Sequence, residues 1–281
     1  MNYIRNKKVG GERPFFQIDN TEFYNCTITE GESALKHCSD IECNNMEFYG
    51  KYVLCYSDNF LVQDSFFDVQ SKASIWYSNN FTINRTRIDA SKLFRNCNNI
   101  CLNEVIMNEA DETFWYCNHI ELTDVSMYNG SYPFMQSTDI DIDGLSIDYC
   151  DYAFQYVKDT VIRNATIISK DAFWETENVT IINSHLEGEY LGWHSNNLKL
   201  VNCHISGEQP LCYANNVTLI NCTFDENCER AFEYSTIYGD IASPLKSIVN
   251  PISGFLNIKN VDEVVIDEYA KGSQDCYINI V

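Results

Sequence analysis

The sequence predicts an all-β protein built as a parallel β-solenoid, and three observations carry this prediction. A short pattern recurs eleven times, with 19 to 21 residues between repeats. Within each repeat apolar residues alternate with polar ones, which is typical of strands. An Asn or Asp stands at the same place in nearly every repeat. A period near 20 residues, made of such short runs, indicates coils that bury their apolar faces by stacking on each other.

Each coil is counted here from one position, called the marker. The markers are Thr21, Ile41, Phe60, Phe81, Ile100, Ile120, Ile140, Thr160, Val179, Leu198 and Val217. Apolar residues also recur six residues before the marker and two and seven residues after it, as Phe94, Leu102 and Met107 do in the coil of Ile100. Three inward columns predict three parallel sheets around one core, in about eleven coils of roughly 20 residues.

Asn or Asp precedes the marker in ten of the eleven coils, as at Asn178, Asn197 and Asn216. A second Asn column follows at Asn183, Asn202 and Asn221. Both residue types tolerate left-handed backbone angles and bond neighbouring main chain. The two columns therefore predict tight corners that repeat from coil to coil.

The repeat divides the chain into three segments of one domain. Residues 15–236 carry the β-solenoid, residues 1–14 are expected to cap its start, and residues 237–281 are expected to form a C-terminal cap with the final strands. The stretch from Gly239 to Gly254 is punctuated by Gly and Pro and predicts a loop over a sheet. Asp240 and Lys246 in this stretch are second-rank catalytic candidates.

Composition restricts the partners and the compartment. The 281 residues carry 19 basic and 40 acidic side chains, a net charge of −21, which disfavours nucleic acid and anionic polysaccharide. No apolar run is long enough to span a bilayer, so no membrane association is expected. Thirteen cysteines, an odd number, and a charged N-terminal segment without an apolar stretch predict reduced thiols in a cytoplasmic protein.

Two neighbouring columns are rich in aromatic residues. Five residues before the marker stand Trp76, Trp115, Trp174 and Trp193, and Tyr residues such as Tyr156 and Tyr213 follow in the next column. Strand alternation sends only one of two adjacent columns outward unless a bulge intervenes. Exposed rings on a flat β-face suit stacking against sugar rings. The alternative is that they fill a wide core or pack against another subunit, so an exposed sheet also leaves room for an oligomer.

Glu175 and His194 replace tyrosine in consecutive coils, 19 residues apart. Equivalent positions in neighbouring coils lie one strand spacing, about 5 Å, from each other. A carboxylate at that distance orients an imidazole and raises its basicity, as general acid and base catalysis requires. Glu175 and His194 are the first-rank catalytic candidates, and an ordinary ion pair is the alternative.

His185 and His204 share another outward column, and Glu187 stands two residues after His185. Two imidazoles and a carboxylate are a ligand set for a divalent metal ion. The alternative is a row of solvated side chains. No other cofactor is expected.

The repeat, the Asn columns and the stretch from Gly239 to Gly254 together resemble an uncharacterised bacterial family, domain of unknown function 3737, with a pectin-lyase-like β-helix. The resemblance covers nearly the full chain and implies a single-stranded, right-handed parallel β-helix. It implies no activity. The Asn-Thr-Asp, Asp-Asp and Gly-His-Gly elements of polygalacturonases do not occur in this sequence.

Two classes of function follow from these observations. The first is a carbohydrate-related protein, either a binding protein or a polysaccharide hydrolase or lyase, that uses the aromatic face with Glu175 and His194. The second is a non-catalytic structural or protein-interaction solenoid, in which the same aromatic residues pack. A groove that combines the rings with titratable groups distinguishes the first from the second.

Overall fold

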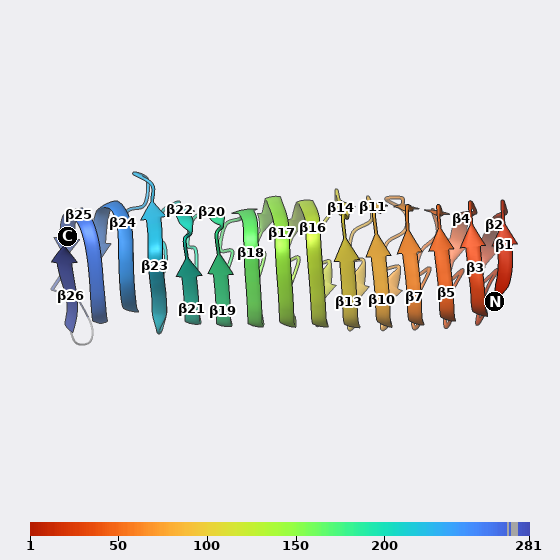
Figure 1. Ribbon diagram of the computed structural model, residues 1–281, viewed down its shortest axis with the longest axis horizontal. Coiled ribbons are helices and arrows are strands. Elements are labelled where there is room, and N and C mark those ends of the chain that lie inside the picture. The colour runs from red at the N-terminus through yellow and green to blue at the C-terminus, as the bar shows by residue number, and fades with distance from the viewer. Residues whose placement is uncertain (269, 271–274) are drawn as a thin grey trace. The chain divides into compact units, whose positions relative to one another are not determined.

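The computed structural model describes residues 1–268, 270 and 275–281. These residues form 26 β-strands and no helix. The chain divides into two compact units, Met1–Ser146 (unit 1) and Ile147–Val281 (unit 2), and strand β17 contains the boundary. Each unit is a parallel β-solenoid, and the units contain about 14 turns in all (Figure 1). The predicted fold type is confirmed.

The strands of unit 1, with β17 at its end, are β1 (Asn2–Arg5), β2 (Lys8–Glu12), β3 (Asp19–Tyr24), β4 (Thr27–Glu32), β5 (Ser39–Asn44), β6 (Glu47–Phe48), β7 (Asp58–Gln63), β8 (Phe66–Phe67), β9 (Ile75–Trp76), β10 (Asn79–Asn84), β11 (Arg87–Ile88), β12 (Phe94–Arg95), β13 (Asn98–Asn103), β14 (Ile106–Met107), β15 (Phe114–Trp115), β16 (Asn118–Ser131) and β17 (Thr138–Asp151). The strands of unit 2 are β18 (Lys158–Ile168), β19 (Glu177–Ile182), β20 (His185–Glu187), β21 (Asn196–Val201), β22 (His204–Ser206), β23 (Val217–Phe224), β24 (Thr236–Val249), β25 (Ser253–Val265) and β26 (Asp275–Ile280).

The strands pair in parallel with their counterparts one coil away. In unit 1, Phe60 of β7 lies opposite Phe81 of β10, which lies opposite Ile100 of β13. In unit 2, Val179 of β19 lies between Thr160 of β18 and Leu198 of β21. Marker residues of neighbouring coils therefore lie opposite each other, as the repeat predicts. The columns read from the sequence correspond to the register in which the strands pair.

The apolar columns form the core of each unit. Leu102, Met107, Ile181 and Leu200 are almost completely buried. Phenylalanine rings in unit 1 stack face to face across neighbouring coils, with 4.8 Å between the ring centroids of Phe94 and Phe114. Such burial of apolar surface in every coil is the main stabilising contribution to a solenoid.

The third face of the coil differs from the expectation of a regular sheet. In the described residues it contains strands only at β9, β12 and β15, which pair in a separate three-stranded sheet, and elsewhere it is a turn. Left-handed residues stand at both ends of this face, such as Lys92 (φ 57°) and Asn96 (φ 52°) around β12. Only three residues remain between them, which is too few for a longer strand.

The two ends of the chain continue the solenoid. Strand β1 pairs in parallel with β3, so residues 2–12 form a turn of the solenoid. Strands β24, β25 and β26 also pair in parallel, one after the other. The stretch from Gly239 to Gly254 therefore lies largely in β24 and at the start of β25, and the prediction of a loop reaching over a sheet is wrong. These turns at the two ends are not among the eleven predicted coils, so the predicted number is lower than the observed number of about 14.

Glycine allows this close strand packing at position 239. Gly239 has φ 143°, and a Cβ atom there would lie 1.8 Å from the carbonyl oxygen of Leu219. The pairing of β24 with β25 also shifts register between Ile241 and Pro244. Gly and Pro in this stretch therefore mark irregular strands.

The Asn columns form hydrogen-bonded ladders at left-handed corners. Asn178 donates to Asp159 over 2.8 Å, Asn197 donates to Asn178 over 2.8 Å, and Asn216 donates to Asn197 over 2.6 Å. The backbone of Asn178 and Asn197 has φ near +57°. Each side chain thus ties the corner of its own coil to the corner of the preceding coil.

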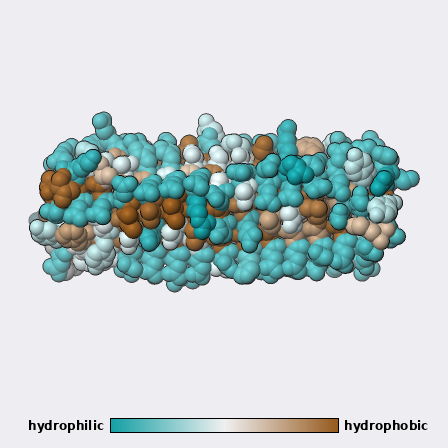
Figure 2. All heavy atoms as spheres, viewed as in Figure 1, coloured by the Kyte–Doolittle hydropathy of each residue, from teal (hydrophilic) through white to brown (hydrophobic). Residues whose placement is uncertain are grey.

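One face of the protein is mainly polar. Hydrophilic residues cover much of this face in Figure 2, interrupted by patches of hydrophobic residues. The thirteen cysteines are free thiols, and all except Cys101 and Cys276 are buried. Among the described residues, no helix is long and apolar enough to cross a membrane.

Candidate functional site

Both aromatic columns reach the surface, because the backbone turns between them. Tyr156, Glu175 and His194 occupy the second column with φ between 52° and 58°, in the left-handed region. A residue in this conformation breaks the alternation of a strand. The second column is therefore exposed or half-buried, and the preceding residues Trp174 and Trp193 are half-buried beside it.

Three of the four tryptophans bond to main chain in the next coil. The indole Nε1 of Trp76 donates to the carbonyl oxygen of Lys92 over 2.7 Å, and that of Trp115 donates to the carbonyl oxygen of Tyr132 over 2.8 Å. Trp193 donates to the carbonyl oxygen of Gln209 over 3.1 Å. These bonds hold the indoles against the solenoid.

The two tryptophans of unit 1 also enclose a cation. The guanidinium carbon of Arg95 lies 4.5 Å from the ring centroid of Trp76 and 4.7 Å from that of Trp115. Arg95 also donates to Glu112 over 3.1 Å. One face of each indole is therefore covered by the Arg95 side chain. These rings contribute to packing and have less surface free for a ligand.

Trp174 is arranged differently from the other three. Its Nε1 donates to the carboxylate Oε1 of Glu175, the next residue, over 3.1 Å. Its ring meets that of Trp193 edge to face, with 6.5 Å between the centroids. The indole of Trp174 thus fixes the Glu175 carboxylate.

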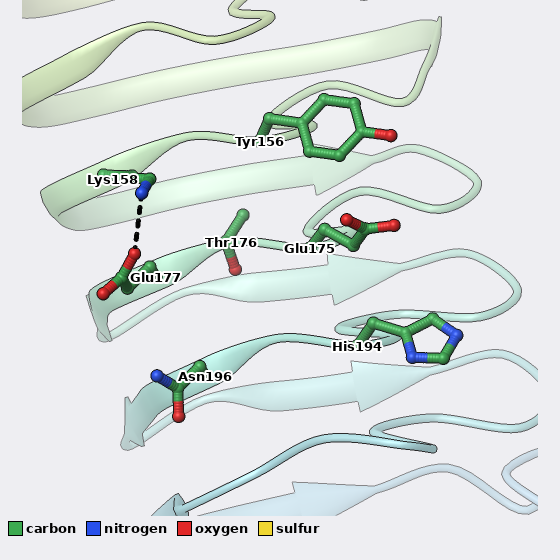
Figure 3. A pocket seen from close by; sticks show the side chains of 7 residues that line it. All are labelled: Tyr156, Lys158, Glu175, Thr176, Glu177, His194 and Asn196. Atoms are coloured by element: carbon green, nitrogen blue, oxygen red, sulfur yellow. Dashed lines mark ion pairs between the residues drawn. The ribbon is translucent and has the colours of Figure 1, made fainter.

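A groove of about 610 Å³ surrounds Glu175 on the surface of unit 2. This groove, called the Glu175 groove below, is lined by Tyr156, Lys158, Glu175, Thr176, Glu177, His194 and Asn196 (Figure 3). The residues come from three successive coils, because Lys158, Glu177 and Asn196 lie opposite one another in β18, β19 and β21. Main-chain bonds hold the corner, with the amide of Glu175 donating to the carbonyl oxygen of Trp193 over 2.8 Å.

Glu175 and His194 line this groove together without being bonded to each other. In the described part of the chain, neither a hydrogen bond nor an ion pair joins the two side chains, which extend in the same direction in Figure 3. The imidazole of His194 stacks on Tyr213 with 5.2 Å between centroids. The other carboxylate of the groove, that of Glu177, is paired with Lys158 over 2.8 Å. The arrangement offers rings, a carboxylate and hydrogen-bonding groups to a ligand.

A buried carboxyl lies in the same turn as Glu175. Asp171 is only 2 % exposed, and its Oδ1 has no hydrogen-bond partner. Burial raises the pKa of Asp171 from 3.8 to about 6, against the opposing effect of Lys170. The sequence pointed to no role for this residue. The one sequence feature that sets Asp171 apart is its acidic side chain at a corner where the neighbouring coils have Tyr152 and Tyr190.

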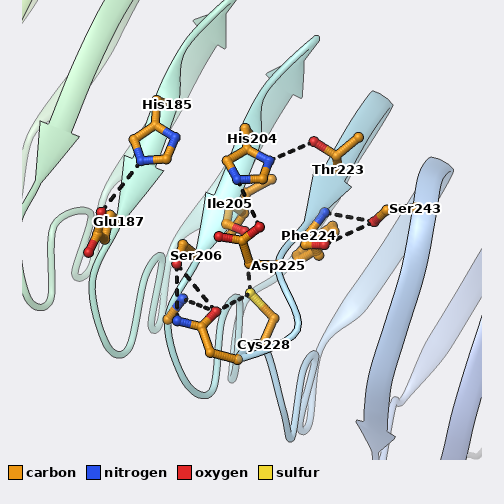
Figure 4. Close-up of polar contacts among 12 residues, drawn as sticks. His185, Glu187, His204, Ile205, Ser206, Thr223, Phe224, Asp225, Cys228 and Ser243 are labelled. Carbon is orange, nitrogen blue, oxygen red and sulfur yellow. Dashed lines mark hydrogen bonds and ion pairs between the residues drawn. The ribbon is translucent and has the colours of Figure 1, made fainter.

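The histidines of the predicted metal site are engaged by separate carboxylates. The rings of His185 and His204 stack with 5.1 Å between centroids, as Figure 4 shows. Nε2 of His185 lies 3.5 Å from Glu187, and Nε2 of His204 lies 3.1 Å from Asp225. Among residues 1–268, 270 and 275–281, no three His, Cys, Asp or Glu side chains are placed to hold a metal ion. Stacked rings with separate partners do not converge on one point.

The second-rank candidates lie outside the groove. Asp240 accepts a hydrogen bond from Asn257 over 2.7 Å, as part of a ladder on β24, β25 and β26. Lys246 is paired with Glu229 over 2.9 Å, and this bond raises the pKa of Lys246. Neither residue lines the Glu175 groove.

Several solved structures are similar to this chain. A surface adhesin of Streptococcus pneumoniae, PfbA, has 8% identity and a TM-score of 0.40, over 94% of this chain and 81% of that protein. The A-module of a mannuronan C-5 epimerase of Azotobacter vinelandii has 11% identity and a TM-score of 0.33, over 97% and 90%. A tailspike protein of E. coli bacteriophage HK620 has 10% identity and a TM-score of 0.38, over 98% and 72%.

Sequence comparison gives the family. No curated protein matches the chain. The model of one protein family, however, matches residues 2–279, nearly the whole chain. The protein belongs to that family, described as proteins of unknown function (DUF3737).

Proposed function

We propose that the protein binds carbohydrate in the Glu175 groove. The observation that carries this proposal is the break in the aromatic column of unit 2. The column continues through Tyr156, His194, Tyr213 and Tyr234, and only Glu175 interrupts it with a shorter, charged side chain. The groove opens at this break.

The spacing of the coils suits a sugar ring. Tyr156 and His194 are two coils apart, which corresponds to about 10 Å between equivalent backbone positions. A pyranose ring lying over Glu175 contacts both rings through its C–H groups and reaches Asn196 with its hydroxyl groups. Ligand sites typically combine such apolar walls with a few fixed polar groups.

The same geometry favours binding over hydrolysis. Glycosidases use two carboxyl groups, one of them with a raised pKa. Of the two carboxylates in the groove, Glu177 is held by Lys158. Asp171, whose pKa is raised, does not line the groove. A polysaccharide hydrolase or lyase therefore has less support than a binding protein.

A structural or interaction solenoid is the second candidate, and the tryptophans of unit 1 favour it. Their indoles are bonded to main chain and cover Arg95, so they contribute to packing. This candidate predicts that the aromatic residues of the groove also serve stability alone.

Titration with a panel of neutral, basic and acidic oligosaccharides distinguishes the two candidates. Binding is followed by tryptophan fluorescence and calorimetry for the wild type, Tyr156→Ala and His194→Ala. Tyr116→Ala is the matched control, because Tyr116 is 48% exposed at the same column position in unit 1 and lies outside the groove. We expect saturable binding that both groove variants weaken at least tenfold and the control leaves unchanged. No binding across the panel, or equal loss in Tyr116→Ala, contradicts the proposal.

A further inference from the structure

We infer that the ligand of the groove carries a positive charge, and that it is an amino sugar whose ammonium group binds Glu175. This inference rests on the proposed function and names the chemical class of its ligand. It starts from the partners of the acidic side chains on this part of unit 2.

Glu175 lacks the cationic partner that its neighbours have. Glu177 is paired with Lys158 over 2.8 Å, and Glu189 is paired with Lys170 over 3.3 Å. In the described part of the chain, no Lys, Arg or His lies within ion-pair distance of Glu175. Its contact is the indole N–H of Trp174, which directs one carboxylate oxygen and leaves the other free for a ligand.

Aromatic rings stand on both sides of this carboxylate. Tyr156 precedes it by one coil, His194 follows it by one coil, and Trp174 adjoins it in the chain. Aromatic faces attract ammonium groups through their quadrupole, and a carboxylate adds a charge-assisted hydrogen bond. Rings around a free carboxylate are therefore a site for a protonated amine.

The charges of the groove point the same way. It contains Lys158, Glu175 and Glu177 as fixed charges, together with the imidazole of His194. Because Lys158 is neutralised by Glu177, the groove has no free lysine for an acidic sugar. The net charge of −21 also attracts cations to the protein and repels uronates and sulfated sugars.

Polar groups along the groove suit a sugar better than a peptide side chain. Asn196 lines the groove, and its side-chain oxygen accepts a hydrogen bond from Asn215 over 2.9 Å, which leaves its side-chain N–H groups as donors for a ligand. Thr176 is only 1 % exposed and its hydroxyl donates to the carbonyl oxygen of Phe173 over 3.2 Å, so it is not available to a ligand. The side-chain amide of Asn196 as donor and the second oxygen of Glu175 as acceptor match the hydroxyl groups of a pyranose.

A matched pair of ligands tests the inference on the wild-type protein. The probes are a glucosamine tetrasaccharide with protonated amines and its fully N-acetylated form, which has the same ring and no charge. Calorimetric titration is expected to show at least tenfold tighter binding of the free-amine form. This preference should decline as salt is added, because salt screens charge attraction.

Two isosteric variants assign the preference to one carboxylate. Glu175→Gln keeps an acceptor for Trp174 and removes the charge, so the preference for the free amine should disappear. Glu189→Gln makes the same change in net charge outside the groove and should leave the preference intact. Oligolysine of equal charge controls for attraction by the acidic protein as a whole, and it should bind more weakly and without dependence on Glu175.

The outcomes separate the two proposals. Equal binding of both tetrasaccharides overturns the amino-sugar inference and leaves carbohydrate binding in place. Binding of neither, together with none in the wider panel, overturns both. A preference for free amine that persists in Glu175→Gln, or oligolysine binding that matches the sugar, shows general charge attraction and also overturns the inference.

Discussion

Left-handed residues at fixed places in each coil decide which side chains meet at the groove. Tyr156, Glu175 and His194 all adopt positive φ, although none of them is Gly, Asn or Asp. Bulky residues rarely adopt this conformation, and each instance costs about 1–3 kcal/mol. The stacked hydrogen bonds of neighbouring coils maintain it. The conformation directs two adjacent aromatic columns outward, which strand alternation alone does not allow.

Asp171 gives a prediction at the residue scale. Its pKa is raised from 3.8 to about 6 by burial, so the folded protein favours the protonated form. The carboxyl is neutral in both the folded and the unfolded state below about 3.8, and it carries an increasing penalty as the pH rises through about 6. Asp171→Asn should therefore increase the free energy of unfolding by about 1–2 kcal/mol at pH values well above 6, and by little near pH 4.

Urea denaturation of the wild type and Asp171→Asn across this pH range measures the effect. The difference between the two proteins should grow with pH, while the slopes of their unfolding curves stay equal. A difference that is constant with pH, or a variant less stable at high pH, would show that the ionised carboxylate has a stabilising partner.

At the scale of the element, each turn of the solenoid depends on how closely its strands approach. The register follows directly from the apolar columns, and the Asn ladders of unit 2 fix its corners from Asp159 to Asn216. Strand β24 is irregular, because it passes close to β23 at a glycine and shifts register against β25.

Gly239→Ala tests this close approach. The new methyl group would lie 1.8 Å from the carbonyl oxygen of Leu219, which is backbone and has little freedom to move. We expect a loss of about 2–4 kcal/mol in the free energy of unfolding. Gly11→Ala is the matched control, because Gly11 also has positive φ (89°) but open space where a Cβ atom would lie. Its cost should be limited to the backbone conformation, about 1–2 kcal/mol. Equal losses in the two variants would rule out the steric explanation.

Much of each element could be predicted from the sequence, because a period near 20 residues leaves few other arrangements. The columns through Ile100, Leu102 and Met107 are strands with buried side chains. The irregular turns were missed, since the Pro and Gly of β24 are also typical of loops. The candidate residues Glu175 and His194 could be placed on one groove from their spacing. The hydrogen bond from Trp174 to Glu175 could not be predicted. The other three tryptophans occupy the same column and bond to main chain instead, so the column position does not determine the partner.

At the scale of the whole molecule, two solenoid units share a strongly acidic composition and a store of buried thiols. The net charge of −21 restricts the partners of both units. Burial raises the pKa of Cys38 to about 12 and that of Cys55 to about 11. Since the thiolate is the reactive form, Cys38 and Cys55 should be unreactive in the folded protein.

Titration with a thiol reagent tests whether burial protects the cysteines throughout the chain. The native protein should react quickly at about two positions, the half-buried Cys101 and Cys276, and at all thirteen after unfolding. Mass spectrometry of the labelled peptides identifies the sites. Rapid labelling of Cys38 or Cys55 in the native protein would show that the core opens.

A crystal structure of the protein with a bound oligosaccharide is the decisive test of carbohydrate binding. We expect a sugar ring in the Glu175 groove, in contact with Tyr156 and His194 and within hydrogen-bond distance of the Glu175 carboxylate. A sugar bound elsewhere, for example along the column of Tyr116, would contradict it, and so would a groove filled by a second copy of the chain while the sugar stays in solution.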